Sequence, residues 1–335
     1  MSITVPAYNA EKYLDKCLAP FEMLKKDKRE AFESIEVIIV NDGSSDNTSG
    51  IAHKYAQQEP EVYKIVDKAN GGHGSGINTG VRMATGKYFK VVDADDWLNS
   101  DELEGYIYLL KKMDSDVIAS DFVCVDDSTL EPFRYIKACA NEDWYGKEID
   151  INEDVLNKVI KMHSFTIKTE ILQTYYTAID EHCFYVDQEY ITFPVPFFNT
   201  VYFDKRNLYM YRLGRRGQSM SADVIKRNRL MHRKVLDRLI EYYNQTSYLE
   251  MSPNKLTYFK RCIGDMVDNQ FQIYISLGNQ KGIEEELRDW DTQLKRDNPD
   301  IYHATSKKSI DILRITNYKI LPLGCLVYKL VKKKG

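Results

Sequence analysis

Short apolar runs alternate with amphipathic stretches over about the first 120 residues. Runs rich in β-branched and aromatic residues predict buried strands at 2–5, 36–40, 62–66, 87–92 and 117–119. The stretches between them predict helices that begin near residues 10, 81 and 101. This alternation predicts an α/β fold, a Rossmann-like and mostly parallel sheet flanked by helices.

The pattern changes at about residue 221. Apolar residues at three- and four-residue spacing predict helices at 224–244, 253–277 and 281–295. We therefore expect two parts, an α/β domain at 1–220 and a C-terminal helical appendage at 221–335. The last segment, 318–335, is apolar with a basic end, which suits an anionic membrane surface; docking on the neighbouring helices is the alternative.

Polar or glycine-rich loops follow four of the predicted strands. They occupy 6–9, 41–48, 70–80 and 93–96, and we expect Pro6 to end the first strand because it has no N–H to donate. The carboxyl ends of parallel strands meet at one edge of the sheet, where ligands bind in such folds. The sequence therefore predicts a single site at this edge.

The strand at 87–92 ends in three carboxylates, Asp93, Asp95 and Asp96. Side chains alternate along a strand, so Asp93 and Asp95 should point the same way. Neighbouring carboxylates repel unless a cation lies between them, and Mg²⁺ or Mn²⁺ prefers such oxygen ligands together with phosphates. The pattern indicates a metal–diphosphate site; the alternative is an acidic turn before a helix.

Two other loops carry groups suited to a nucleotide. Asp42 can accept a hydrogen bond from a base, and Tyr8 offers a ring to stack on it. The glycines of 70–80 would let backbone N–H groups and the following helix N-terminus approach phosphates. This loop lacks the P-loop ending, and a turn-rich connection is the alternative.

Composition narrows the class of protein. Of 335 residues, 43% are hydrophobic and 29% charged, as is ordinary for a soluble globular protein. The net charge of −4 gives no general attraction to nucleic acid. The six cysteines are scattered without a CxxC pair, which is typical of reduced thiols. Because residues 2–5 are already predicted to form a strand, we expect that no signal peptide precedes it and that the protein is cytoplasmic.

Together the four loops resemble the motifs of the family-2 glycosyltransferases, which use nucleotide-sugar donors on a GT-A fold. Members of that family commonly carry Arg before the Asn of the third motif, where this chain has Ile77, so one expected cation near the diphosphate is missing. The matching segments are Val5-Pro-Ala-Tyr-Asn9 with Glu11, Val40-Asn-Asp-Gly-Ser-Ser-Asp-Asn-Thr48, the glycine-rich Asn70 to Gly80, and Val92-Asp-Ala-Asp-Asp-Trp97.

The resemblance implies roles for residues of these motifs. The metal, Mn²⁺ or Mg²⁺, would be held by Asp95 with Asp93, the latter near the ribose and diphosphate, and Asp96 would lie toward the sugar. The base, expected to be uracil, would be held by Pro6, Ala7, Tyr8 and Asp42. The remaining donor-binding candidates are Glu11, Asn70, Gly72, Asn78 and Ala94.

The second half must supply the catalytic base. Phe184-Tyr-Val-Asp187-Gln-Glu189-Tyr190 resembles the carboxylate motif of the family, and we assign the base role to Asp187 rather than Glu189. The alternative is an acidic helix N-terminus without a chemical role.

Two further segments offer candidates for the diphosphate or the acceptor. Arg212, Arg215, Arg216 and Ser219 could bind the departing diphosphate or an acceptor phosphate, with a solvated basic loop as the alternative. His163 is either an extra metal ligand or acceptor contact, or a structural histidine.

The resulting hypothesis is a metal-dependent, inverting glycosyltransferase with its catalytic domain at 1–220. It would move a hexose or N-acetylhexosamine from a UDP-sugar to a glycan, lipid-linked or glycoprotein acceptor. We expect it in the cytoplasm, with membrane-surface contact through the basic tail and an open choice between monomer and homo-oligomer. A nucleotidyltransferase and a non-catalytic donor-binding or scaffolding subunit are the alternatives.

Overall fold

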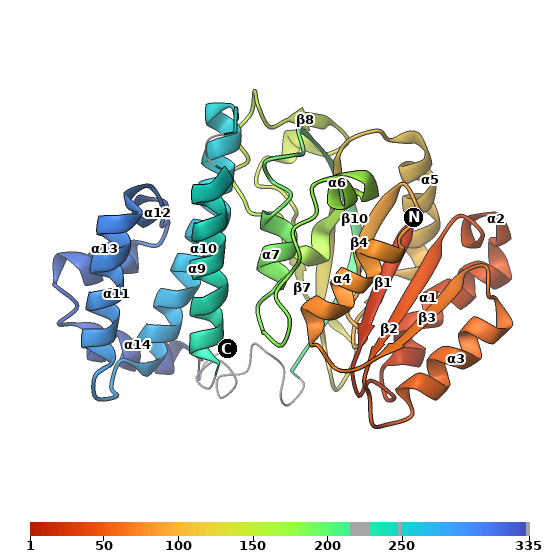
Figure 1. The fold of residues 1–335 in the computed structure, drawn as a ribbon, viewed down its shortest axis with the longest axis horizontal. Coiled ribbons are helices and arrows are strands. Elements are labelled where there is room, and N and C mark those ends of the chain that lie inside the picture. Colours follow the sequence, from red (N-terminus) through yellow and green to blue (C-terminus); the bar gives the residue numbers. More distant parts are fainter. Residues whose placement is uncertain (215–227, 247–248, 333–335) are drawn as a thin grey trace. The chain divides into compact units, whose positions relative to one another are not determined.

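The computed structural model describes residues 1–214, 228–246 and 249–332. The chain divides into two compact units, Met1–Gln218 and Ser219–Gly335. Figure 1 shows a sheet flanked by helices in the first unit and helices in the second.

The first unit is built on a 10-stranded sheet in the order β3-β2-β1-β4-β9-β6-β10-β5, with β7 beside β6 and β8 beside β10. Strands β3, β2, β1 and β4 are parallel, and β9 runs antiparallel to both of its neighbours. The strands are β1 (Ser2–Ala7), β2 (Glu36–Asp42), β3 (Tyr63–Lys68), β4 (Tyr88–Val91), β5 (Trp97–Leu98), β6 (Val117–Asp126), β7 (Pro132–Ile136), β8 (Glu148–Asp150), β9 (Phe165–Lys168) and β10 (Thr200–Leu213).

Helices cover both faces of this sheet. The helices of the first unit are α1 (Leu14–Asp27), α2 (Arg29–Phe32), α3 (Thr48–Gln58), α4 (His73–Met83), α5 (Ser100–Lys112), α6 (Thr169–Thr174) and α7 (Asp187–Thr192), with 3₁₀ turns η1 (Glu142–Trp144) and η2 (Met162–Ser164).

Strand β1 shows why both faces need cover, since all six of its residues are buried. Ile3 and Val5 belong to the core under α1 and α5, while a Cβ at Gly80 of α4 would lie 2.0 Å from Oγ1 of Thr4. Successive side chains of a strand point to opposite faces, so α1 and α4 lie on opposite sides of β1. A strand buried on both faces reads as a continuous apolar run, as the sequence predicted.

The expectation that Pro6 ends the first strand is wrong. Pro6 lies inside β1, level with Val40 of β2. The carbonyl of Thr4 accepts from the N–H of Val92, so Thr4 and, two residues on, Pro6 direct their backbone groups toward β4. Strand β4 pairs with β1 only as far as Thr4, so the missing N–H of Pro6 breaks no ladder hydrogen bond.

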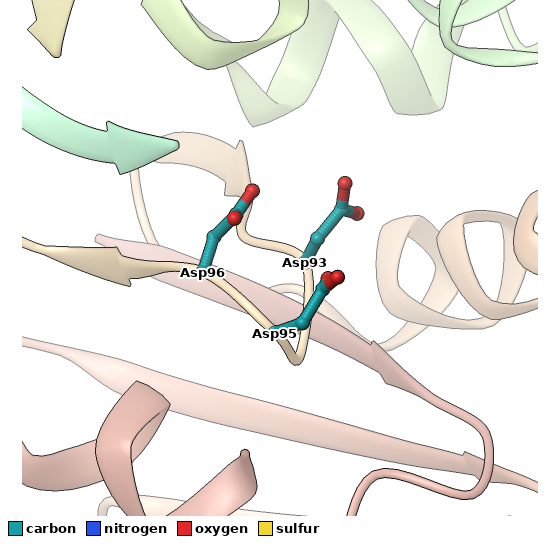
Figure 2. Close-up of side chains that lie close together, drawn as sticks. All are labelled: Asp93, Asp95 and Asp96. Carbon is teal, nitrogen blue, oxygen red and sulfur yellow. The ribbon is translucent and has the colours of Figure 1, made fainter. Parts of the chain in front are cut away.

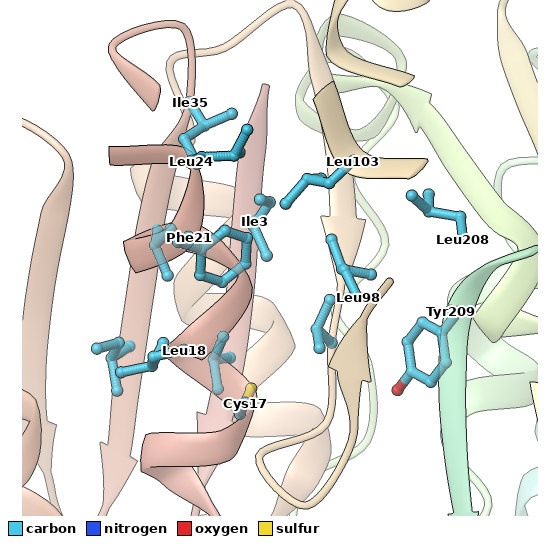
Figure 3. Packing of buried hydrophobic residues seen from close by; sticks show 14 of the residues in the cluster. Ile3, Cys17, Leu18, Phe21, Leu24, Ile35, Leu98, Leu103, Leu208 and Tyr209 are labelled. Carbon is cyan, nitrogen blue, oxygen red and sulfur yellow. The ribbon is translucent and has the colours of Figure 1, made fainter. Parts of the chain in front are cut away.

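The larger core cluster lies between the sheet and helices α1 and α5. Figure 3 shows Leu18 and Phe21 of α1 among side chains of the strands, with Leu103 of α5 beside them. These three side chains are fully buried, and each such side chain contributes about 1.5–3 kcal/mol by leaving water. The polar loops follow the carboxyl ends of the strands, outside this core.

The glycine-rich motif is mostly helix rather than loop, because α4 already begins at His73. Glycines of this motif pack closely against other segments of the chain. A Cβ at Gly74 would lie 2.2 Å from the carbonyl oxygen of Asp180. Gly80 contacts β1, as described above. The expectation that this motif is an open loop approaching phosphates is therefore wrong for these two positions, since their lack of a side chain permits close packing.

The second unit is helical, as predicted. Helix α10 matches the expected range 253–277, whereas α11 is displaced by two residues from 281–295. Among the described residues, no helix combines the length and apolarity needed to span a membrane. The helices are α9 (Arg229–Thr246), α10 (Pro253–Leu277), α11 (Ile283–Asp297), α12 (Pro299–His303), α13 (Lys308–Ile315) and α14 (Leu321–Lys332).

Candidate active site

The loops after β1 and β2 are joined by reciprocal hydrogen bonds. The Asn9 carboxamide oxygen accepts from the Ser45 backbone N–H at 2.8 Å, and the Glu11 carboxylate accepts from that of Asn47 at 2.9 Å. Asn9 has a φ of 49°, a left-handed conformation that Asn tolerates. The preceding Tyr8 is 57% exposed, so its ring is available for stacking at the rim of this edge.

Asp42 holds the start of the glycine motif in place. Its carboxylate accepts the N–H groups of Gly71 and Gly72 at 2.9 and 2.7 Å and pairs with Lys68 at 2.9 Å. The Asn70 side chain donates to the Asp42 carbonyl at 2.9 Å. Asp42 is only 3% exposed, so it orders this turn in addition to any contact with a base.

The three aspartates after β4 gather at the carboxyl edge (Figure 2). One carboxylate oxygen from each of Asp93, Asp95 and Asp96 lies within 4.8 Å of the others. Asp93 and Asp95 are partly exposed, and Asp96 is 1% exposed. The turn therefore presents two partly exposed carboxylates beside a buried one.

Asp96 is committed to protein contacts. Its carboxylate accepts the Tyr209 hydroxyl at 2.7 Å and the Arg212 backbone N–H at 2.8 Å. Burial, followed by the charges of Asp95 and Asp93, raises the pKa of Asp96 well above its usual range. These contacts favour a supporting role for Asp96 over the direct sugar contact expected from the resemblance.

His73 is a site residue that the sequence reasoning missed. Its Nε2 lies 2.8 Å from Oδ1 of Asp93, in the first turn of α4. Burial opposes protonation of the ring, but the Asp93 carboxylate outweighs it and raises the pKa of His73. The available signal was simple: His73 is the one ionisable side chain between Asn70 and Gly80.

Asp187 begins α7 and lies within electrostatic range of His73 and Asp93. Its Oδ2 accepts from the Gln188 side chain at 2.8 Å, and burial raises the pKa of Asp187. Glu189 is fully buried, and its carboxylate accepts the Asp180 backbone N–H at 2.7 Å. Of the two carboxylates, Asp187 is the accessible one.

Asn78 contacts the protein rather than open space. Its side-chain amide donates to the Ile179 carbonyl at 2.8 Å and accepts the Ile179 N–H at 2.9 Å, and the residue is 2% exposed. Its expected role as a direct donor contact stays a prediction. Asn78 fixes the segment that leads to Asp187.

The His163 ring is enclosed by aromatic side chains. It stacks on Phe122 at 4.9 Å and lies 4.1 Å from the Tyr211 ring, measured between centroids. Burial lowers the pKa of His163 to about 4, which keeps the imidazole neutral. The structural alternative is therefore favoured over a metal or acceptor contact.

The Arg212 guanidinium lies among aromatic rings. That group lies 5.0 Å from the Tyr13 ring and 5.2 Å from the Trp97 ring, and it pairs with Asp127 at 3.4 Å. Arg212 is 6% exposed, and its contact with a departing diphosphate stays a prediction. Ile77 is fully buried, and Arg215, Arg216 and Ser219 lie outside the described residues.

The comparisons with known proteins agree with this geometry. Residues 2–176 match the family described as Glycosyl transferase family 2. The chain belongs to glycosyl transferase family 2. It is 29% identical over 175 residues to the glycosyltransferase GlyG of Streptococcus pneumoniae, a match that covers 52% of this chain and 55% of GlyG. The matched region thus spans about half the length of that relative.

Two solved structures share the fold. TarS of S. aureus (residues 1–349), in complex with UDP-GlcNAc, gives a TM-score of 0.62 at 19% identity and covers 98% of this chain and 88% of its own. The mannosyltransferase PcManGT of Pyrobaculum calidifontis, in complex with GDP-Man and Mn²⁺, gives a TM-score of 0.51 at 14% identity. This match covers 99% of the present chain and 87% of PcManGT. The GT-A architecture with a helical C-terminal region, expected from the sequence, is confirmed.

Proposed function

We propose that this family-2 glycosyltransferase is metal-dependent and inverting, and that it uses a UDP-sugar donor. The observation that carries the proposal is the position of Asp187 at the same edge as Asp93 and Asp95, within electrostatic range of His73 and Asp93. One accessible carboxylate thus faces the groups that would hold a diphosphate.

Asp95 and Asp93 would hold the divalent ion. They fit it because both are partly exposed oxygen donors, and one carboxylate oxygen of each lies within 4.8 Å of the other and of Asp96. When bound, such an ion stabilises the charge that develops on a departing diphosphate. The Tyr209 hydroxyl supports this turn by donating to Asp96 and accepting from the Asp93 backbone N–H at 3.1 Å.

Asp187 would act as the base. An acceptor hydroxyl attacks the anomeric carbon and its proton passes to the Asp187 carboxylate, while the bond from that carbon to the diphosphate oxygen breaks and the oxygen keeps the electron pair. Burial raises the pKa of Asp187 and thereby strengthens it as a base. Direct displacement inverts the anomeric configuration.

Three features support the donor assignment. The exposed Tyr8 ring and the Asp42 carboxylate, which follow β1 and end β2, would contact the uracil of the donor. TarS, which shares the fold, is solved with UDP-GlcNAc. A hexose or N-acetylhexosamine is therefore the proposed sugar, and a hydroxyl of a glycan, a lipid-linked molecule or a glycoprotein is the proposed acceptor.

The test is the variant Asp187→Asn with Asp143→Asn as its control. Asp143 is an exposed carboxylate of η1. We expect Asp187→Asn to lower sugar transfer by about 100-fold or more while UDP-sugar affinity in calorimetry stays unchanged. Near-normal transfer by Asp187→Asn, with the control also normal, would remove the base assignment.

A further inference from the structure

Helix α14 exposes an apolar face. Leu323, Leu326, Val327 and Leu330 are 60%, 60%, 53% and 61% exposed. Their spacing of three, four and seven residues from Leu323 places them along one side of the helix. Four large apolar side chains in contiguous helical positions form a patch rather than scattered surface residues.

The opposite side of α14 anchors the helix within its unit. Leu321 and Cys325 are buried, at 0% and 1% exposure. The Cys325 thiol donates to the Ser276 carbonyl of α10 at 3.5 Å. Helix α14 is therefore already packed on α10 through one side, and the apolar face on its other side stays exposed in the folded unit.

The charges of the 312–335 segment, which contains α14, have a single sign. The last acidic residue of the chain is Asp311, and the 312–335 segment contains only basic charges, in a protein whose net charge is −4. Arg314 pairs with Asp291 at 2.8 Å, which leaves five lysines in this segment. They are Lys319, which is exposed, Lys329 and Lys332 within α14, and Lys333 and Lys334 beyond the described residues.

We propose that α14 docks this protein on an anionic lipid bilayer. The leucine and valine side chains enter the boundary between headgroups and acyl chains, and the basic charge of the 312–335 segment attracts it to the negative surface. The helix has 12 residues, a rise of about 18 Å against a hydrocarbon core of about 30 Å, so it lies along the surface.

A second copy of the chain explains this surface less well. Pairing two apolar faces would cover the leucines, but the lysines of each copy would gain no countercharge. An anionic bilayer satisfies both features at once. The inference rests on the second unit alone and does not depend on the chemistry proposed for the first.

The experiment is sedimentation of the full chain with vesicles of phosphatidylcholine, with and without phosphatidylglycerol. We expect binding to the mixed vesicles only, weakened by added salt because surface electrostatics are screened. The double variant Leu326→Glu/Leu330→Glu should reduce binding by at least about tenfold, since it removes two inserting side chains and adds negative charge. Both side chains are mostly exposed, so folding should be unaffected, as circular dichroism would verify.

The matched control is Leu230→Glu on α9, because Leu230 is also 61% exposed. This variant should bind vesicles as the parent chain does. Failure of the parent chain to bind anionic vesicles would overturn the proposal, as would unchanged binding by the double variant. A concentration-dependent dimer abolished by the double variant, without vesicle binding, would assign the face to a second copy instead.

Discussion

The imidazole of His73 and the carboxylate of Asp93 lie 2.8 Å apart, so a helix N-terminus and a strand end meet through one side-chain pair. The two residues are 20 positions apart, in the third and fourth motifs of the family. The contact orients the Asp93 side chain, while the Tyr209 hydroxyl accepts a hydrogen bond from the Asp93 backbone N–H at 3.1 Å. Asp93 is thus positioned by both its side chain and its main chain.

We expect His73→Ala to weaken Mn²⁺ binding by about tenfold, because partners that orient a metal-binding carboxylate typically contribute that much. Titration of the purified variant with Mn²⁺ would measure it. His53→Ala is the matched control, since His53 pairs with Asp67 at 2.7 Å in a similar contact on α3. Equal Mn²⁺ affinities in the parent and His73→Ala would contradict the orienting role.

Tyr209→Phe should lower the free energy of unfolding by about 1–3 kcal/mol, because it leaves the buried Asp96 carboxylate without one of its donors. The same loss should raise the pKa of Asp96 further, since the Tyr209 hydrogen bond lowers it. Urea unfolding would measure the change. Tyr202→Phe, near the start of the same strand, serves as the control, and equal losses in both variants would count against a specific Asp96 contact.

Gly74→Ala should displace the segment that leads to Asp187. The new Cβ would lie 2.2 Å from the backbone oxygen of Asp180, which cannot rotate away as a side chain can. We expect a stability loss of about 1–3 kcal/mol together with a fall in transfer rate. Gly105→Ala in α5 is the control, because its Cβ would meet the flexible Arg206 side chain at 3.3 Å. Full activity in Gly74→Ala would show that the close contact does not position Asp187.

Glu36 gives the first unit a defined acid sensitivity. Burial alone would raise its pKa, but the Lys64 ammonium and hydrogen bonds from Ser2 and Thr85 lower the pKa of Glu36 from 4.5 to about 2. A lowered folded-state pKa stabilises the fold above pH 4.5, and this contribution is lost as the pH falls toward 2. We expect the loss to be about 2 kcal/mol after screening.

Urea unfolding between pH 5 and about 2.5 would test this in the parent and in Glu36→Gln. The variant should be less stable than the parent at pH 5. Its free energy of unfolding should depend less on pH, because glutamine does not titrate in this range. Parallel pH profiles for the two proteins would show that Glu36 does not account for the acid sensitivity.

The sequence was sufficient for β1, β2, β3, β4 and β6 and for the edge that carries the candidate site, but it did not predict the other five strands of the sheet. A continuous apolar run such as 36–40 is typical of a parallel strand that is buried on both faces. The carboxyl ends of parallel strands lie at one edge of the sheet, so the polar loops that follow them gather there. It was insufficient for Pro6, because the length of the neighbouring strand β4 decides whether a missing N–H breaks a hydrogen bond. That length depends on tertiary pairing.

Individual site roles were harder to predict for the same reason. Asn78 bonds Ile179 across 101 positions, and Arg212 lies between the rings of Tyr13 and Trp97. No local pattern in the sequence predicts such contacts, so it did not show that these two side chains also bind distant parts of the protein. His73 was missed for the converse reason, since its partner lies on another element.

The most direct test of the central claim is to incubate the purified chain with a panel of nucleotide sugars and measure released nucleoside diphosphate, with Mn²⁺ and with a chelator. We expect release of UDP from one UDP-sugar, loss of that release with the chelator, and recovery when Mn²⁺ is restored. Release that persists in chelator, release of pyrophosphate, or the absence of any nucleotide binding would contradict it.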